Sequence, residues 1–208
     1  MDKVFSLLEE METKGVLVTL ITYNALINGL CKGGKMIEAS TLLKEISARG
    51  LAADNVTYNT LMDGYCKGGT VLRALDVYKE MEARGIEPDV ITCNVLIKAL
   101  CMAGHFREAT DVFKWMPDRG LDPNTVTFCI LIGEYCKTDK IEEDLAFWEE
   151  LQRRGVMPNI SNYNSVINAF CKKGRISVAS NLLKDALDKG LIPDVITYRD
   201  LIKAHSEE

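Results

Sequence analysis

The stretch that decides the fold is Ile21–Ile27, which reads Ile-Thr-Tyr-Asn-Ala-Leu-Ile. The same pattern returns after 35 residues as Val-Thr-Tyr-Asn-Thr-Leu-Met at Val56–Met62, and after 35 more as Ile-Thr-Cys-Asn-Val-Leu-Ile at Ile91–Ile97. Three further copies begin at Val126, Ser161 and Ile196. A pattern that recurs at one fixed period of this length predicts an array of similar modules stacked on one another.

Three other residue types keep the same register. Cysteine recurs at Cys31, Cys66, Cys101, Cys136 and Cys171; glycine at Gly15, Gly50, Gly85, Gly120, Gly155 and Gly190; proline at Pro88, Pro123, Pro158 and Pro193. Because a repeat array buries its apolar faces between neighbouring modules and has no single central core, the length of this chain counts repeats and not ordinary domains.

We divide the chain into full repeats at residues 20–54, 55–89, 90–124, 125–159 and 160–194. Residues 1–19 are expected to supply the second helix of a preceding repeat, and residues 195–208 the first helix of a following one. Positions within a repeat are counted from Leu20, Asn55, Val90, Thr125 and Ile160.

Each repeat is expected to contain two amphipathic helices. In the first repeat, helical spacing of apolar residues predicts a first helix through Tyr23, Leu26, Ile27 and Leu30 and a second through Ala39, Leu42, Leu43 and Ile46. We expect Thr22, at position 3, to be the N-cap of the first helix. Gly33-Gly34 would separate the two helices, and the second would end near Gly50 in a left-handed conformation.

Two short helices cannot bury both apolar faces alone, so each pair should stack on the next. The expected fold is an all-α, right-handed superhelical solenoid of helix-turn-helix repeats, with the first helices lining the inner surface. At about 100° per residue, positions 2, 5, 9 and 13 of the first helix lie opposite its apolar stripe. The residues at position 5 are therefore expected to point away from the core.

Composition and charge limit the function classes. The net charge of −5 argues against indiscriminate polyanion binding, although it allows a basic stripe on one face. The cysteine column, the lack of a CxxC motif and the wide separation of His105 and His205 predict buried reduced thiols, with no metal and no cofactor. The sequence shows no phosphate-binding glycine loop and no pairing of nucleophile and base, so we expect no enzymatic activity.

The sequence also gives no sign of a membrane or targeting segment. No apolar run approaches the roughly 18 residues that suggest a membrane span. Met1 is not followed by a basic and then apolar leader, so we expect no targeting peptide within this chain.

The eleven residues Thr22–Lys32, which read Thr-Tyr-Asn-x-Leu-Ile-x-x-Leu-Cys-Lys, together with Ala39 and the 35-residue period, resemble the pentatricopeptide repeat family of the P type. The Leu-Cys-Lys and Gly-Gly elements resemble those of fertility-restorer-like members, and the resemblance covers essentially the whole chain. Tetratricopeptide repeats are a poorer match, because their period is 34 and their Trp and Gly-x-x-Tyr elements are absent here.

The resemblance implies sequence-specific binding of single-stranded RNA in plant mitochondria, or alternatively chloroplasts, with one base read per repeat by positions 5 and 35 together. It assigns uracil to the pairs Asn24 with Asp54, Asn59 with Asp89, and Asn164 with Asp194. It assigns either pyrimidine to Asn94 with Asn124, and it leaves the base at Cys129 with Asn159 unread or weakly read. The implied core is 5′-U-U-Y-N-U-3′, and Arg199 occupies position 5 of the partial last copy.

The residue chemistry fits this reading. An Asn amide offers a donor and an acceptor to a base edge, whereas an Asp carboxylate only accepts and so favours a base with an imino hydrogen, such as uracil.

Two further columns are implied to contact RNA. Position 2 would sandwich the bases with Ile21, Val56, Ile91, Val126, Ser161 and Ile196, where Ser161 should make the weakest contact. Position 13 would place Lys32, Lys67, Lys137 and Lys172 near phosphates, with Met102 interrupting the row.

Plainer interpretations remain open at this stage. The Asn column could serve the backbone, and the Lys column could be only a solvated face. The chain would act on organellar RNA in processing, stability or translation. The alternative is a structural or interaction protein, for example a ribosome-associated member of the family that binds protein or folded ribosomal RNA.

Overall fold

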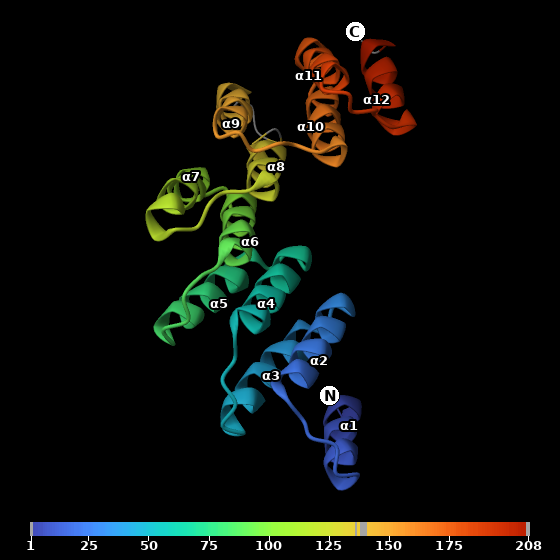
Figure 1. Ribbon diagram of the computed structural model, residues 1–208. Coiled ribbons are helices and arrows are strands. Elements are labelled where there is room, and N and C mark those ends of the chain that lie inside the picture. Colours follow the sequence, from blue (N-terminus) through green and yellow to red (C-terminus); the bar gives the residue numbers. More distant parts are fainter. Residues whose placement is uncertain (1, 136, 138–140, 207–208) are drawn as a thin grey trace. The chain divides into compact units, whose positions relative to one another are not determined.

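The computed structural model describes residues 2–135, 137 and 141–206. Within these ranges the secondary structure is helical and contains no strand, so the expected all-α fold is confirmed (Figure 1). The helices are α1 Asp2–Thr13, α2 Leu20–Lys32, α3 Met36–Ala48, α4 Asn55–Lys67, α5 Val71–Ala83, α6 Val90–Met102, α7 Phe106–Trp115, the 3-10 helix η1 Pro117–Arg119, α8 Thr125–Tyr135, α9 Ile141–Arg153, α10 Ile160–Lys172, α11 Ile176–Asp188 and α12 Val195–Ser206.

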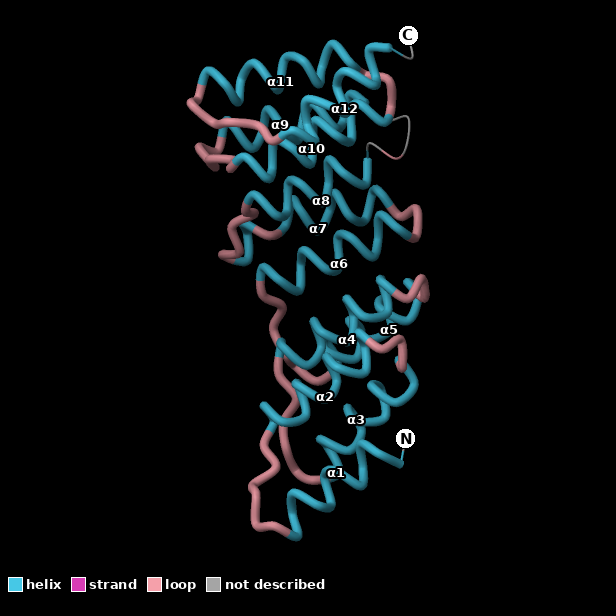
Figure 2. Tube along the Cα trace, turned by 90° about the vertical axis from the view of Figure 1, so that its right-hand side faces the viewer, coloured by secondary structure: helices cyan, strands magenta, loops and turns pink. Residues whose placement is uncertain are grey.

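The chain divides into two compact units, Met1–His105 and Phe106–Glu208. In the first unit α2 packs against α3 and α4 against α5, and the successive first helices α2, α4 and α6 also pack on one another. The second unit repeats this arrangement with the pairs α8/α9 and α10/α11 and the first helices α8, α10 and α12. Figure 2 shows the short turns that join the helices of each pair. The right-handed superhelix stays a prediction.

The apolar stripes predicted for the first repeat lie in the core. Tyr23, Ile27 and Leu30 of α2 are buried, Leu26 is half-buried, and Ala39, Leu42, Leu43 and Ile46 of α3 are all buried. The cysteine column follows the same rule: Cys66, Cys101 and Cys171 are buried and Cys31 is half-buried, while Cys136 lies outside the described residues.

Glycine and proline end the second helices. Gly50 follows α3 with a φ of 72°, the left-handed conformation that a glycine adopts without steric cost, as expected. One helix end was not expected from the sequence: α7 stops at Trp115, and Pro117 begins the 3-10 turn that follows. Proline lacks the N–H that an α-helix needs and clashes with the preceding turn.

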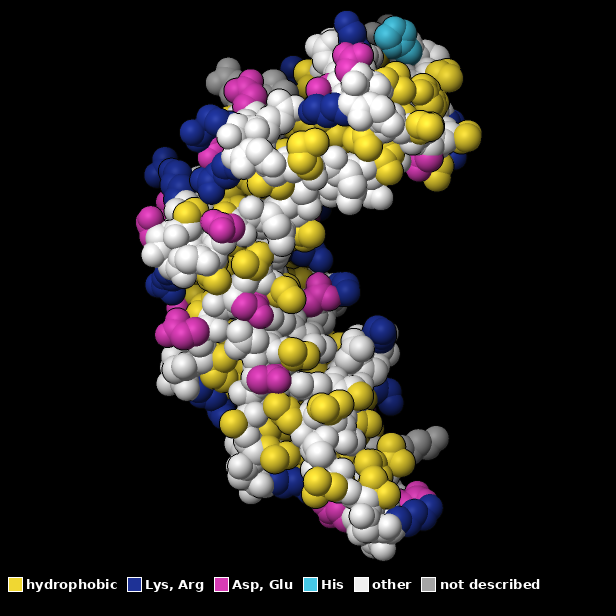
Figure 3. All heavy atoms as spheres, in the orientation of Figure 1, with side chains coloured by type: hydrophobic (Ala, Val, Ile, Leu, Met, Phe, Trp, Pro, Cys, Tyr) yellow, Lys and Arg dark blue, Asp and Glu magenta, His cyan; other side chains and the backbone are white. Residues whose placement is uncertain are grey.

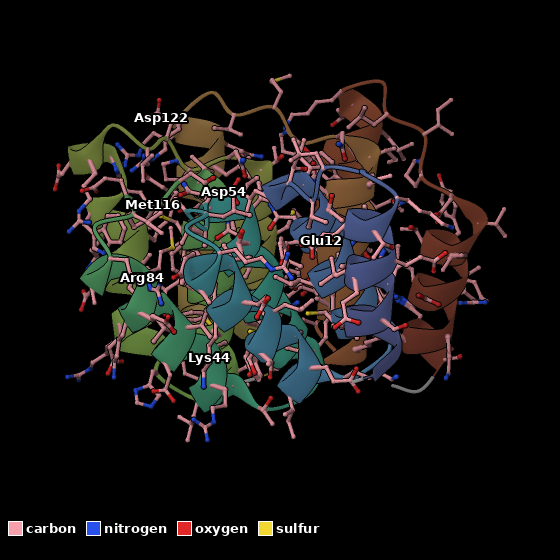
Figure 4. The ribbon with its side chains drawn as sticks, turned by 90° about the horizontal axis from the view of Figure 1, so that it is seen from below. Glu12, Lys44, Asp54, Arg84, Met116 and Asp122 are labelled. Atoms are coloured by element: carbon pink, nitrogen blue, oxygen red, sulfur yellow. The ribbon has the colours of Figure 1, made fainter. Side chains whose placement is uncertain are left out.

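Polar ties join successive helix pairs of the first unit on the side of the second helices. Arg49, which follows α3, pairs with Glu12 of α1 and with Glu45. Arg84, which follows α5, donates to the hydroxyl of Ser47 at 2.8 Å. Glu12 and Arg84 are labelled in Figure 4. No helix in the described part of the chain is long and apolar enough to cross a lipid bilayer.

Candidate functional site

The residue at position 35 of each repeat caps the first helix of the next one. Asp54 precedes α4 with an extended backbone (φ −116°, ψ −179°), and its side chain accepts a hydrogen bond from the backbone N–H of Thr57. Thr19, Asp89 and Asn159 are the N-caps of α2, α6 and α10. The expectation that Thr22 is an N-cap is therefore wrong: Thr22 is already inside the helix, as its third residue.

The position-3 side chain completes a capping box. Asp54 Oδ1 accepts from the backbone N–H of Thr57 at 2.9 Å, and the Thr57 hydroxyl lies 2.9 Å from the same oxygen and 3.4 Å from the Asp54 backbone nitrogen. At Asp89 the corresponding distances to Thr92 are 2.7, 2.8 and 3.2 Å. Two of the backbone donors at each helix start are thus satisfied by side-chain oxygens.

The position-5 amide belongs to the same cluster. Asn24 donates Nδ2 to Asp54 Oδ1 at 3.3 Å, and Asn59 donates Nδ2 to Asp89 Oδ1 at 3.2 Å. The structure thus brings together the members of these two predicted reading pairs, each member coming from a different first helix or its cap.

The environment of the position-5 residues differs from the expectation. Asn59 and Asn94 are only 7% exposed, and Asn24 and Asn164 are half-buried, because the next first helix stacks beside them. The interpretation that they simply point away from the core is therefore wrong. The amide oxygens of Asn59, Asn94 and Asn164 are buried and accept no hydrogen bond within the described chain. The atom that each amide can offer to a ligand is therefore its nitrogen.

The carboxylates of the cluster are held ionised. Burial acts to raise the pKa of Asp54, but hydrogen bonds from Thr57 and Asn24 outweigh it and keep that pKa below the ordinary value. Burial is likewise outweighed at Asp89, where Thr92, Asn55 and Asn59 lower the pKa. At Asp194, hydrogen bonds from the backbone and side chain of Thr197 lower the pKa. Each carboxylate is therefore a charged acceptor at neutral pH.

An asparagine at position 35 caps in the same way. Asn124 Oδ1 accepts from the backbone N–H groups of Val126 and Thr127 at 3.0 and 3.1 Å. Asn159 Oδ1 accepts from the backbone N–H of Asn162 at 3.0 Å. Because a helix start offers only donors, the cap turns the amide oxygen inward and leaves Nδ2 as the remaining polar atom.

The fourth repeat carries a different arrangement. Asn162 replaces threonine at position 3 and donates its side-chain Nδ2 to Cys129 Sγ at 3.3 Å. Cys129 is half-buried, and burial raises the pKa of its thiol, so the group stays neutral. A weakly polar thiol thus stands where other repeats place an amide nitrogen.

The position-2 side chains form the apolar border of these clusters. Ile21, Val56, Ile91, Val126 and Ile196 are between 51% and 80% exposed, and Ser161 is also exposed. In Figure 3 hydrophobic side chains are spread over the visible face of α1, α2 and α3. Large exposed aliphatic groups in a regular column are available to contact a flat ligand.

A hollow of about 330 Å³ in the first unit brings the predicted columns together. Its walls include Val56 and Ile91 from position 2, the pair Asn59 and Asp89, and Lys67 from position 13. A larger hollow of about 970 Å³ contains Lys32 and Lys67 but none of the base-reading residues. The smaller one therefore has the composition of a specific site, a few polar groups set among apolar walls.

The lysines predicted for phosphates, Lys32, Lys67, Lys137 and Lys172, are all exposed. Two already have carboxylate partners: Lys67 pairs with Asp63 at 2.5 Å and Lys137 with Glu134 at 2.6 Å.

Sequence analysis missed some of the neighbours of these lysines. Asp63 at position 9 also lies 3.5 Å from Lys98. In the second unit, Lys172 shares a hollow of about 490 Å³ with Arg199 and Lys203. The signal that could have found them is the position-9 column, which lies on the same helix face as positions 2, 5 and 13.

Comparison with protein families gives a match along most of the chain. The model of the PPR repeat family matches residues 1–32, 18–67, 53–102, 88–137 and 158–207. A second model, described as PPR repeat, matches residues 126–156. No curated protein sequence matches the chain.

Several solved structures are similar to the chain. The pentatricopeptide repeat protein PPR10 from maize is 32% identical, with a TM-score of 0.65 over 96% of this chain and 28% of that one. PPR10 in complex with an 18-nt psaJ RNA element is 26% identical, with a TM-score of 0.73 over 92% of this chain and 28% of that one. The chain thus spans little more than a quarter of PPR10. The PPR domain of Arabidopsis thaliana protein-only RNase P 1, in complex with tRNA, shares the fold at 15% identity, with a TM-score of 0.68 over 88% of this chain and 96% of that one.

Proposed function

Because the chain belongs to the pentatricopeptide repeat family, we propose that it binds single-stranded RNA and reads one base per repeat in the core 5′-U-U-Y-N-U-3′. The observation that carries this proposal is the recurring cluster in which Asn24 meets Asp54 and Asn59 meets Asp89. The relative PPR10, solved with an RNA element, supports RNA as the ligand class.

The Asn and Asp pairs have the polarity that uracil requires. One proton of Asn59 Nδ2 is donated to Asp89 Oδ1, and the second remains for a carbonyl oxygen of the base. The other carboxylate oxygen of Asp89 can accept the imino hydrogen of uracil. Cytosine has no such hydrogen, so it would leave a charged acceptor without a donor.

The Asn pairs offer a different pattern. Asn124 and Asn159 use Oδ1 for the helix cap, so each offers Nδ2 as a donor. A donor at this place suits the unprotonated ring nitrogen of cytosine or adenine. With Asn94, Asn124 would select a pyrimidine. With Cys129, Asn159 would discriminate weakly, since the thiol is a poor hydrogen-bonding group.

The remaining columns hold the strand without reading it. The exposed aliphatic residues of position 2 would sandwich neighbouring bases, with a weaker contact at Ser161. Lys32, Lys67, Lys137 and Lys172 would approach phosphates. Four such contacts give a slope of roughly −0.7 × 4 in a plot of log affinity against log salt for a single strand.

In the cell, this mode of binding fits an RNA-binding protein of an organelle that acts in transcript processing, stability or translation. The P-type, fertility-restorer-like pattern at Thr22–Lys32 favours plant mitochondria, with chloroplasts as the alternative. Binding to protein or folded ribosomal RNA is the second candidate. It is favoured by the carboxylate partners of Lys67 and Lys137, which reduce the charge available for phosphates.

Fluorescence anisotropy with labelled oligonucleotides tests the proposal. The probes carry UUCAU, UUUAU or AAGAA cores, with the DNA form of the first, each at two salt concentrations. We expect both pyrimidine-rich cores to bind more tightly than AAGAA. Weak binding without preference would overturn the proposal in favour of the second candidate.

The variant Asn59→Ser with Asp89→Asn tests the register. It should change the preference at the second base from uracil towards adenine and leave the first base unchanged. Unaltered selectivity at the second base would contradict the assigned register.

A further inference from the structure

We propose that the threonine at position 3, Thr57, Thr92 or Thr197, is a positioning residue that fixes the reading carboxylate of the preceding repeat with Oδ1 towards the helix and Oδ2 towards the RNA. This inference rests on the proposed function, because it concerns the accuracy of base selection by the same sites. It assigns to the capping box a part in specificity in addition to its part in helix stability.

The first argument is that the hydrogen bonds converge on one oxygen. Asp54 Oδ1 takes the backbone N–H and lies beside the hydroxyl of Thr57, and it also takes Nδ2 of Asn24. Asp194 Oδ1 lies 2.8 Å from both the nitrogen and the hydroxyl of Thr197. All these bonds end on Oδ1, so the carboxylate is held in one orientation and its second oxygen is left for a ligand.

The second argument is the burial of the threonine hydroxyls. Thr57 and Thr92 are 0% exposed and Thr197 is 2% exposed, so their hydroxyls must be satisfied within the protein. The Thr92 hydroxyl oxygen accepts from the backbone N–H of Asp89, and its proton is directed to Asp89 Oδ1 at 2.8 Å. A hydrogen bond to a charged acceptor is stronger than one between neutral groups. The threonine therefore restrains the side-chain rotation of the aspartate more than the backbone cap does alone.

The third argument comes from the sites with asparagine at position 35. The Thr127 hydroxyl lies 3.3 Å from Asn124 Oδ1, farther than the 2.8 Å at Asp89 and Asp194. In the fourth repeat Asn162 bonds to Cys129 instead, and its oxygen accepts from the backbone N–H of Asn159. The short hydroxyl contact thus accompanies the carboxylate sites, where an ionised reader gains most from it.

The inference predicts an effect confined to one base. A valine has the shape of threonine without the hydroxyl, and the backbone N–H that caps the aspartate is kept. Thr57→Val should reduce the preference for uracil over cytosine roughly threefold to tenfold at the first base, the range of one hydrogen bond. Thr92→Val should do the same at the second base. Each variant serves as the control for the other, because each should leave the other base's selectivity unchanged.

Two further variants separate positioning from folding. Thr57→Ser keeps a hydroxyl and should retain the wild-type preference. Thr41→Val removes a hydroxyl that donates to the Ile37 carbonyl inside α3 and should change no base preference. Thermal unfolding of every variant shows whether the helix array is intact.

The measurement is the ratio of affinities for probes with U or C at the first or second position, by anisotropy on the 208-residue chain. Loss of selectivity at the matching base only, with rescue by serine, supports the inference. An equal loss for all probes, or a lower unfolding temperature with an unchanged ratio, would overturn it and leave a purely structural cap. If the wild-type chain itself does not distinguish UUCAU from AAGAA, the proposed function has failed instead.

Discussion

The reading clusters of the second and fourth repeats start from the same helix cap and offer different chemistry. At the second repeat, Asn59 donates to Asp89, and a charged carboxylate with one remaining oxygen faces the hollow. At the fourth repeat, the direction of the bond is reversed: Asn162 donates to Cys129, and Asn159 keeps only its Nδ2 for a ligand.

The difference shows that capping and reading are separate demands on one side chain. An N-cap needs a side-chain oxygen, and both aspartate and asparagine supply it. The second polar atom is then oxygen in one case and nitrogen in the other. Position 35 can therefore change base preference at little cost to the helix, which is useful in a protein that varies its specificity repeat by repeat.

The largest effect is expected from converting the fourth site into a copy of the second. Cys129→Asn with Asn159→Asp restores the amide donor and the charged acceptor. The fourth base, nearly unread in the wild type, should become uracil, with a preference of about tenfold over adenine. Anisotropy with the four bases at that position measures it. A Cys129→Asn single variant serves as the control, because it supplies the donor without the carboxylate. If the double variant remains indifferent at the fourth base, the geometry at Cys129 cannot support reading.

The stability of the two sites should be similar although their chemistry differs. Asp54→Ala and Asn159→Ala each remove an N-cap and should each lower the free energy of unfolding by about 1 kcal/mol. Asp122→Ala changes an exposed aspartate in the loop before α8 and should have little effect (Figure 4). Urea unfolding followed by circular dichroism measures all three. A loss at Asp54 far greater than at Asn159 would mean that the charge and not the cap dominates.

Acid should separate the two kinds of cap. The pKa of Asp54 is lower in the folded chain than its ordinary value of about 3.9, so its stabilising effect is complete above that value and is lost as the pH falls through the folded pKa. Asp54→Asn keeps a cap oxygen that does not titrate. The variant should therefore lose less stability than the wild type between about pH 5 and pH 3.

The control for this experiment is already in the chain. Asp185 and Glu150 also have lowered pKa values and are present in both proteins, so they contribute equally to the acid loss. Thermal unfolding at a series of pH values gives the difference. Parallel curves for the two proteins would show that the Asp54 carboxylate contributes no charge-dependent stability.

The sequence was sufficient for the fold because the period and the apolar stripes are local signals. Burial of Tyr23 and Ile27 and the left-handed Gly50 follow from residue spacing alone. The cap was misassigned to Thr22 because threonine suits both the N-cap and the third helical position, and only backbone angles distinguish them.

The site was predicted less completely, since it forms between repeats. A helical wheel places Asn59 opposite the apolar stripe, but it does not include the next helix that covers it to 7% exposure. The bond from Asn162 to Cys129 and the position of Asp63 between Lys67 and Lys98 join residues about one repeat apart. Such contacts depend on how modules stack, which no pattern within one module reports.

The smallest expected effect concerns the lysines, and it extends the comparison to the phosphate side. Lys67 pairs with Asp63, whereas Lys32 is exposed without an ion-pair partner among the described residues. Lys32→Ala should therefore flatten the salt dependence by about 0.7 in slope, the effect of one phosphate contact on a single strand. Lys67→Ala should weaken all RNAs alike but flatten the slope less, because its charge is already partly compensated and fewer counterions are released. The slope is obtained from anisotropy at several salt concentrations, with Lys44→Ala on α3 as a control that should leave it unchanged. Equal slopes for the Lys32 and Lys67 variants would show that the Asp63 pair opens when RNA binds and that both lysines meet phosphate freely.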